Sequence, residues 1–166
     1  MIIHPRTNGP MIWAHAATPA ALDAILEVLL RAQIIEPSLS YVLSAPASEY
    51  VFDSEVVRLQ EPYPQSGQDF LKKMSPDLCL WVEDSINIPF FGLIQKFSIQ
   101  IILINAKTRK LRGRTWLWRK TVARQALRPV SYAFVETVEA SGHLRNLGLP
   151  ERNIEVLGPV LAGVVA

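Results

Sequence analysis

The fold of this chain is decided by residues 76–107, PDLCLWVEDSINIPFFGLIQKFSIQIILINAK. The stretch holds two short apolar runs, residues 78–82 and 101–104, and such unbroken runs are typical of parallel strands buried on both faces. Residues 88–97 between them form an amphipathic segment that is long enough for a crossover helix. The pattern therefore predicts a βαβ unit with a right-handed crossover.

Polar residues follow each of these two predicted strands. Glu83-Asp84-Ser85 comes directly after the first strand, and Asn105-Ala106-Lys107 comes directly after the second. In open α/β sheets the ligand crevice lies just beyond the carboxyl ends of the strands. We therefore expect these residues to lie where such folds bind their ligands.

Strands and helices alternate on both sides of this unit. A first strand is predicted at residues 11–16. Thr18 and Pro19 then suit the N-cap and the first residue of a helix. The apolar residues of this helix follow at helical spacing: Leu22, Ile25, Leu26, Leu29 and Leu30. The other predicted strands are 39–44, 56–59, 132–135 and 154–157, and the other helices are 67–74, 115–127 and 137–147, the last ended by Gly148. This alternation predicts an α/β fold, a three-layer α/β/α Rossmann-like sandwich with a mostly parallel sheet.

Length and composition indicate one globular domain over residues 1–166. The chain is 49% hydrophobic and 19% charged, which argues against disorder. No stretch reaches the roughly 20 apolar residues of a membrane span. Residues 1–10 contain no signal-peptide core, and we expect them to be a flexible start. Together these two observations lead us to expect a cytoplasmic protein. The single cysteine, Cys79, lies within an apolar run and is interpreted as an inert core residue.

The common nucleotide and metal signatures are missing. The first strand runs into HAATPAAL rather than GxGxxG, and no GxxxxGK[ST] occurs, which disfavours dinucleotide enzymes and P-loop NTPases. His4 and His143 show no ligand spacing relative to His15, so no metal site is predicted. We expect no cofactor.

Four segments resemble, in the same order and at similar spacing, the N-terminal domain of the 3-deoxy-D-manno-octulosonic acid (Kdo) transferases. They are IWAHAATPAAL, PDLCLWVEDSI, IILINAK and AFVETVEASGHLRNLGLPERNIEVLG. Kdo transferases attach Kdo to the lipid A precursor during lipopolysaccharide biosynthesis. The resemblance implies one half of a GT-B fold, in which this domain binds the lipid acceptor and a second domain binds the donor, CMP-Kdo. Residues 159–166 would then begin the interdomain linker.

Departures from the family pattern fall on its functional residues. The family reads roughly HAVSVGE after the first strand, and its glutamate is the catalytic base; here Ala21 stands in that position. The family's ETE becomes Glu83-Asp84-Ser85, which keeps the first carboxylate and loses the second. Its NAR ends here in Lys107, which replaces a bidentate guanidinium with a point charge.

The resemblance implies five acceptor-binding candidates: His15, Thr18, Glu83, Asn105 and Lys107. Each has an alternative structural interpretation. His15 either supports its loop by hydrogen bonds or contacts a sugar or phosphate oxygen. Glu83 is either a carboxylate of the cleft, a cap of the following turn or a neutralising partner of Lys107.

Residues 107–120, KTRKLRGRTWLWRK, carry seven basic residues and no acidic one. The segment is either a solvated helix start with a tryptophan packed on the sheet, or a patch for an anionic glycolipid or membrane surface. The candidates for such a patch are Arg109, Lys110, Arg112, Arg114, Trp116, Arg119 and Lys120. Nucleic acid is a less favoured partner because the net charge is only +2.

These observations lead to three hypotheses. The first is a Kdo-transferase-like acceptor domain that is inactive alone, a pseudoenzyme because of Ala21 and a missing donor domain. The second is the acceptor-binding half of a split active glycosyltransferase, with a separate donor-domain protein as its partner. The third is an anion- or nucleic-acid-binding module. Under the first two, we expect a cytoplasmic protein that is peripheral at the inner membrane.

Overall fold

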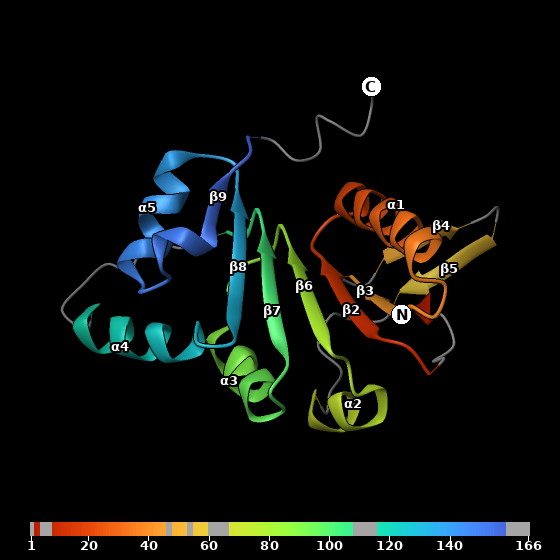
Figure 1. Cartoon of the computed structure of the whole chain (residues 1–166), viewed down its shortest axis with the longest axis horizontal. Helices are drawn as coiled ribbons and strands as arrows, with labels where there is room; N and C mark the ends of the chain where they lie inside the picture. Colours follow the sequence, from red (N-terminus) through yellow and green to blue (C-terminus); the bar gives the residue numbers. More distant parts are fainter. Residues whose placement is uncertain are drawn as a thin grey trace.

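The computed structural model describes residues 2–3, 8–45, 48–52, 55–59, 67–107 and 116–158. Within them, one sheet of seven strands has the order β1-β3-β2-β6-β7-β8-β9 (Figure 1). The strands are β1 (Ile2–Ile3), β2 (Met11–Ala16), β3 (Ser40–Ser44), β6 (Leu78–Val82), β7 (Gln100–Ile104), β8 (Val130–Val135) and β9 (Ile154–Val156). All neighbouring pairs are parallel except β1 with β3. The predicted mostly parallel α/β fold is confirmed.

Helices lie on both faces of the sheet. They are α1 (Pro19–Ile35), α2 (Gly67–Met74), α3 (Ile88–Lys96), α4 (Trp116–Ala126) and α5 (Val138–Asn146), and a short 3-10 helix, η1, spans Glu151–Asn153. Helix α1 packs alone against one core cluster, while α2, α3, α4 and α5 contribute to the cluster on the opposite face. The strands alternate between the two clusters, so that Cys79 and Trp81 face one and Leu80 and Val82 face the other. This is the two-sided burial expected of parallel strands.

Local sequence signals set the ends of the helices as predicted. The Thr18 hydroxyl accepts the backbone N–H of Ala21 at 3.2 Å, and Pro19 begins α1. Asn87 caps α3 in the same way through the N–H of Phe90. Gly148 ends α5 with a φ of +100°, a left-handed conformation that glycine adopts without steric cost.

Three features differ from the sequence expectation. The predicted strand at residues 56–59 exists as β5 (Glu55–Leu59), but it pairs antiparallel with β4 (Ser48–Phe52) in a separate two-stranded sheet. Neither β1 nor β4 was predicted. Leu30 was expected in the buried stripe of α1, yet 45% of it is exposed, because the buried stripe consists of Ala21, Leu22, Ile25, Leu26 and Leu29.

The strand order places a topological switch point between β2 and β6. From β2 the chain proceeds to β3 on one side, whereas from β6 it proceeds to β7 on the other. The two connections therefore leave neighbouring carboxyl ends in opposite directions, which opens a crevice in folds of this type. The register pairs Ala16 with Val82 at these ends.

Cys79 offers a test of the core. Its side chain is fully buried on β6, and burial raises the pKa of its thiol far above the usual range. Because the thiolate is the reactive form, we expect the native protein to react with the thiol reagent DTNB no faster than it unfolds. The unfolded chain in concentrated guanidinium chloride should react at once with one equivalent. Rapid labelling in native buffer would contradict the buried placement of β6.

Candidate functional site

The candidate site lies at the switch point between β2 and β6. The turn after β2 contributes Ala17 and Thr18, and the turn after β6 contributes Glu83 and Asp84. The Ala17 N–H donates to the Val82 carbonyl at 3.1 Å, so the two turns are joined through the backbone. Polar side chains from segments 65 residues apart therefore meet at one rim.

Thr18 links the start of α1 to Glu83. Its hydroxyl oxygen accepts the Ala21 N–H, and the same hydroxyl donates to the Glu83 carboxylate at 3.3 Å. The carboxylate is thereby directed toward the first turn of α1. Within the described residues no ion pair joins Glu83 to Lys107, so the hydroxyl of Thr18 is the partner that the structure gives this carboxylate.

Glu83 and Asn105 both adopt left-handed backbone conformations, with φ of 55° and 49°. Such a conformation costs a non-glycine residue about 1–2 kcal/mol, and it is more common for asparagine than for glutamate. Backbone hydrogen bonds from Glu83 to the Ile104 carbonyl (2.8 Å) and from Asn105 to the Phe134 carbonyl (2.9 Å) hold both turns. Strained turns of this kind cluster at functional sites.

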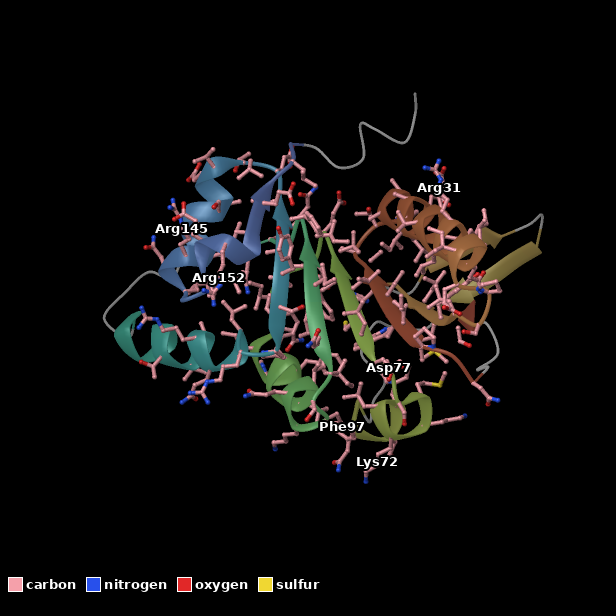
Figure 2. All side chains as sticks on the ribbon, viewed as in Figure 1. Arg31, Lys72, Asp77, Phe97, Arg145 and Arg152 are labelled. Atoms are coloured by element: carbon pink, nitrogen blue, oxygen red, sulfur yellow. The ribbon has the colours of Figure 1, made fainter. Side chains whose placement is uncertain are left out.

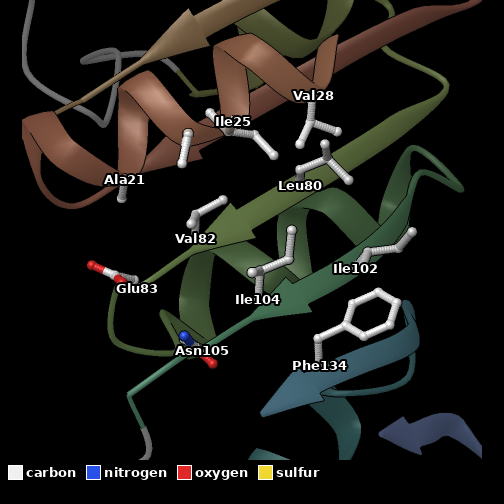
Figure 3. A pocket seen from close by; sticks show the side chains of 11 residues that line it. Ala21, Ile25, Val28, Leu80, Val82, Glu83, Ile102, Ile104, Asn105 and Phe134 are labelled. Carbon is white, nitrogen blue, oxygen red and sulfur yellow. The ribbon is translucent and has the colours of Figure 1, made fainter. Parts of the chain in front are cut away.

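A pocket of about 230 Å³ opens beside these turns. Figure 3 shows Glu83 and Asn105 at one end, Ala21 close to Glu83, and apolar side chains along the rest. The lining residues come from α1 and from β6, β7 and β8: Ala21, Ala24, Ile25, Val28, Leu80, Val82, Glu83, Ile102, Ile104, Asn105 and Phe134. Among the described residues, Oδ1 of Asn105 is buried and has no hydrogen-bond partner.

His15 lies behind the rim in a buried chain of hydrogen bonds. Its Nε2 is 2.9 Å from Oδ2 of Asp84, and its Nδ1 is 3.1 Å from Oγ of Ser44. The indole of Trp13 donates to the same Ser44 oxygen at 2.9 Å. The His15 side chain is fully buried, whereas 23% of Asp84 is exposed. Asp84 is therefore the member of this chain that a ligand can touch.

The partners define the protonation of His15. A carboxylate only accepts hydrogen bonds, so Nε2 carries the proton that is donated to Asp84. Ser44 accepts from Trp13 and has its own hydroxyl proton for Nδ1 of a neutral imidazole. Burial lowers the pKa of His15 from its ordinary value of 6.5, and the hydrogen bond and charge of Asp84, together with Ser44, offset only part of this effect.

The structure brings together four of the sequence candidates and separates others. Thr18, Ala21, Glu83 and Asn105 gather at the rim and the pocket, while Lys107 is exposed and its backbone N–H donates to the Asp84 carbonyl at 2.9 Å. Arg109, Lys110, Arg112 and Arg114 lie outside the described residues. Trp116, Arg119 and Lys120 belong to α4, but their side chains are not among those described.

Sequence reasoning expected Asp84 at the ligand-binding edge but did not include it among the acceptor-binding candidates, and it missed Ser44 and Trp13 as members of the site. A signal was present, because Ser44 ends β3 and Asp84 follows β6, the two strands that flank β2. To use this signal, the strand order had to be known, and the sequence alone did not supply it.

Within the described residues no group of three or more His, Cys, Asp or Glu side chains could hold a metal ion. No helix of the described part combines the length and apolar character needed to cross a membrane.

His15 should make stability depend on pH. Because its pKa in the folded chain lies below 6.5, the unfolded chain takes up a proton first as the pH falls. The free energy of unfolding should therefore decrease between about pH 6.5 and the folded pKa, by up to about 1.4 kcal/mol per pH unit. Urea titrations from about pH 7.5 to pH 5.5 measure this slope.

A single variant isolates the source of this slope. His15→Gln should flatten the pH dependence, because it removes the buried imidazole that titrates. An NMR titration of the His15 ring provides a direct readout. Equal slopes in the wild type and in His15→Gln would show that another group titrates.

Comparison with solved structures supports the Rossmann-like fold. S. aureus MnaA in a structure with UDP matches with a TM-score of 0.53 at 14% identity, over 92% of this chain and 46% of that chain. UDP-GlcNAc 2-epimerase from Neisseria meningitidis, bound to UDP-GlcNAc, matches with a TM-score of 0.50 at 16% identity, over 88% and 45%. Another UDP-N-acetylglucosamine 2-epimerase gives 0.51 at 12% identity, over 90% and 48%. This chain thus spans slightly less than half of each.

Sequence comparison identifies the family. No curated protein matches the chain significantly. The family model described as 3-deoxy-D-manno-octulosonic-acid transferase (kdotransferase), which represents the N-terminal glycosyltransferase domain, matches residues 2–161. That range includes every strand of the sheet and both turns of the candidate site. The chain therefore belongs to the Kdo transferase family and corresponds to its N-terminal domain.

Proposed function

We propose that this chain is the acceptor-binding domain of a Kdo-transferase-type glycosyltransferase and that it transfers no sugar by itself. The observation that carries the proposal is the position of Ala21, which lines the same pocket as Glu83 and Asn105. In the family a glutamate at this position deprotonates the acceptor hydroxyl. A methyl group cannot accept a proton, and general-base assistance is typically worth ~10²–10⁴-fold in rate.

Acceptor binding is supported by the polar groups of the rim. The carboxylates of Glu83 and Asp84 accept hydrogen bonds from sugar hydroxyls, and the Asn105 carboxamide both donates and accepts. The ammonium group of Lys107 stands at the end of the neighbouring strand and attracts anionic phosphates. A phosphorylated glycolipid such as a lipid A precursor combines these features. The basic segment 107–120 would then meet lipid headgroups at the cytoplasmic membrane surface.

The donor side of the reaction belongs to a second half of the fold. The chain spans 46% of the solved MnaA structure, and in Kdo transferases the second domain binds CMP-Kdo. The carboxyl edge of the sheet is the side on which such a domain closes over the ligand. The donor half is supplied either by further sequence or by a separate chain.

The chain alone should be inactive. Incubated with CMP-Kdo and a lipid A precursor, it should form no more product than the reaction without protein, because the methyl group of Ala21 cannot act as the base. Mass spectrometry of the lipid fraction measures the product. Robust transfer by the unchanged chain would refute the proposed inactivity.

A carboxylate introduced at residue 21 should restore sugar transfer when the donor half is present. With the donor-side half of a Kdo transferase added, Ala21→Glu should raise the rate of transfer by ~10²–10⁴-fold over the unchanged chain. Ala24→Glu is the matched control, since Ala24 lines the same pocket one turn further along α1. A similar gain in both variants, or in neither, would place the base elsewhere.

A further inference from the structure

Helix α1 exposes large apolar residues on the side that faces away from the sheet. Ile34 and Ile35, which end the helix, are 80% and 86% exposed, and Leu30, one turn earlier, is 45% exposed. The side of a surface helix that points away from the core is usually polar. Exposed apolar residues that gather on one face are a sign of an interaction surface.

Charged residues run along the same side of α1. Asp23, Glu27 and Arg31 follow one another at intervals of four residues, so they form one row. Glu27 and Arg31 form an ion pair within the helix, and Figure 2 shows Arg31 directed away from the sheet. We call this row, together with Leu30 and Ile34, the outer face of α1. Its acidic residues precede its basic and apolar residues along the helix.

This order makes the outer face complementary to itself. When two α1 helices lie antiparallel and are centred near residue 29, Glu27 of one copy stands opposite Arg31 of the other. Ile34 of each copy then stands opposite Ala24 of the other, whose small side chain leaves room for a branched one. A parallel arrangement would instead set Glu27 against Glu27 and Arg31 against Arg31, which is unfavourable.

We propose that the outer face of α1 binds a second copy of this chain, through an antiparallel pair of α1 helices related by a two-fold axis. Dimers of this symmetry are the most common assemblies of soluble proteins, and each copy contributes the same surface. The contact between Glu27 and Arg31 therefore occurs twice, once on each side of the axis.

The size of this contact corresponds to a weak dimer. A helix of 17 residues is about 25 Å long, and it packs on a second helix at an interaxial distance of about 8–10 Å. One such helix pair buries less than the roughly 1,200–2,000 Å² of a stable interface. We therefore expect a dissociation constant of about 10–300 µM.

A membrane surface is a poorer partner for the outer face. Helices that lie on anionic membranes carry Lys and Arg on their polar side, where these residues meet the lipid headgroups. The outer face instead carries the two carboxylates of Asp23 and Glu27 and the single guanidinium of Arg31. Anionic headgroups would be repelled by this balance of charge, whereas a second copy offsets it.

The dimer leaves both candidate sites open. Helix α1 begins at the carboxyl end of β2 and returns along the sheet to the start of β3, which is parallel to β2. Two antiparallel α1 helices therefore turn the carboxyl edges of their sheets in opposite directions. The rims that carry Thr18 and Glu83 stand at opposite ends of the dimer, so this pairing does not depend on the proposed function.

Sedimentation velocity of the full chain, from about 1 µM to about 1 mM, measures self-association. We expect a monomer at the lowest concentration and a substantial fraction of dimer at the highest. Ile34→Asp should weaken the dimer by at least about tenfold, because each copy would bring a further charge into the contact. Val138→Asp is the matched control, since Val138 is 71% exposed on α5, which packs on the other face of the sheet.

A charge exchange tests the antiparallel register. At low salt Arg31→Glu should weaken the dimer by about tenfold, because carboxylates would then face one another across the axis. Glu27→Arg combined with Arg31→Glu in one chain recreates both opposed pairs and should restore the wild-type dissociation constant to within about threefold. Circular dichroism and thermal melts establish that each variant is folded.

Four results would overturn the dimer proposal. A chain that stays monomeric at about 1 mM would remove the second copy as the partner. Association that Ile34→Asp leaves unchanged would place the contact elsewhere, and a double exchange that fails to restore binding would exclude the antiparallel register. A monomeric chain whose binding to phosphatidylglycerol vesicles requires Ile34 would make the outer face a lipid surface. Since no sugar is present, these outcomes are independent of whether the domain takes part in Kdo transfer.

Discussion

The parallel pairing of β2 with β6 is the constraint on which the rest of this structure depends. Its register runs from Ile12 opposite Leu78 to Ala16 opposite Val82, so both strands end at the same level. The chain then leaves them in opposite directions, toward β3 and toward β7. Each rim residue occupies its place because of this pairing. A shift of β2 by one residue would turn His15 to the face opposite Trp81 and dismantle the site.

The buried chain from Trp13 through Ser44 and His15 to Asp84 fixes the geometry of that rim. Burying a polar side chain without partners costs about 1–3 kcal/mol, so each member is retained only because the others satisfy it. The hydrogen-bond chain begins internally at the indole N–H of Trp13, which only donates. It therefore positions the Asp84 carboxylate at the rim.

The candidate site combines a polar rim with an apolar floor. Hydrogen-bonding groups line the carboxyl edge, whereas the floor beneath them is apolar. Ala21 occupies a position in which a longer acidic side chain would enter the pocket beside Glu83. The scaffold of a Kdo transferase N-terminal domain is therefore present.

The sequence by itself determined the local structure and the family. The apolar runs at 78–82 and 101–104 fixed two central strands, Thr18 and Pro19 fixed the start of α1, and Gly148 fixed the end of α5. These features depend on side chains within a few residues of one another, and the family match extends over residues 2–161.

Only the tertiary structure decided which side chains meet. Residues 56–59 form the predicted strand but pair in a separate hairpin, and Leu30 of α1 turned outward. Asp84 joins His15 across 69 residues, and Ser44 joins it across 29. Such contacts depend on strand order and register, which are set by the burial of whole elements against each other rather than by local periodicity. For that reason the composition of the rim became visible only in the fold.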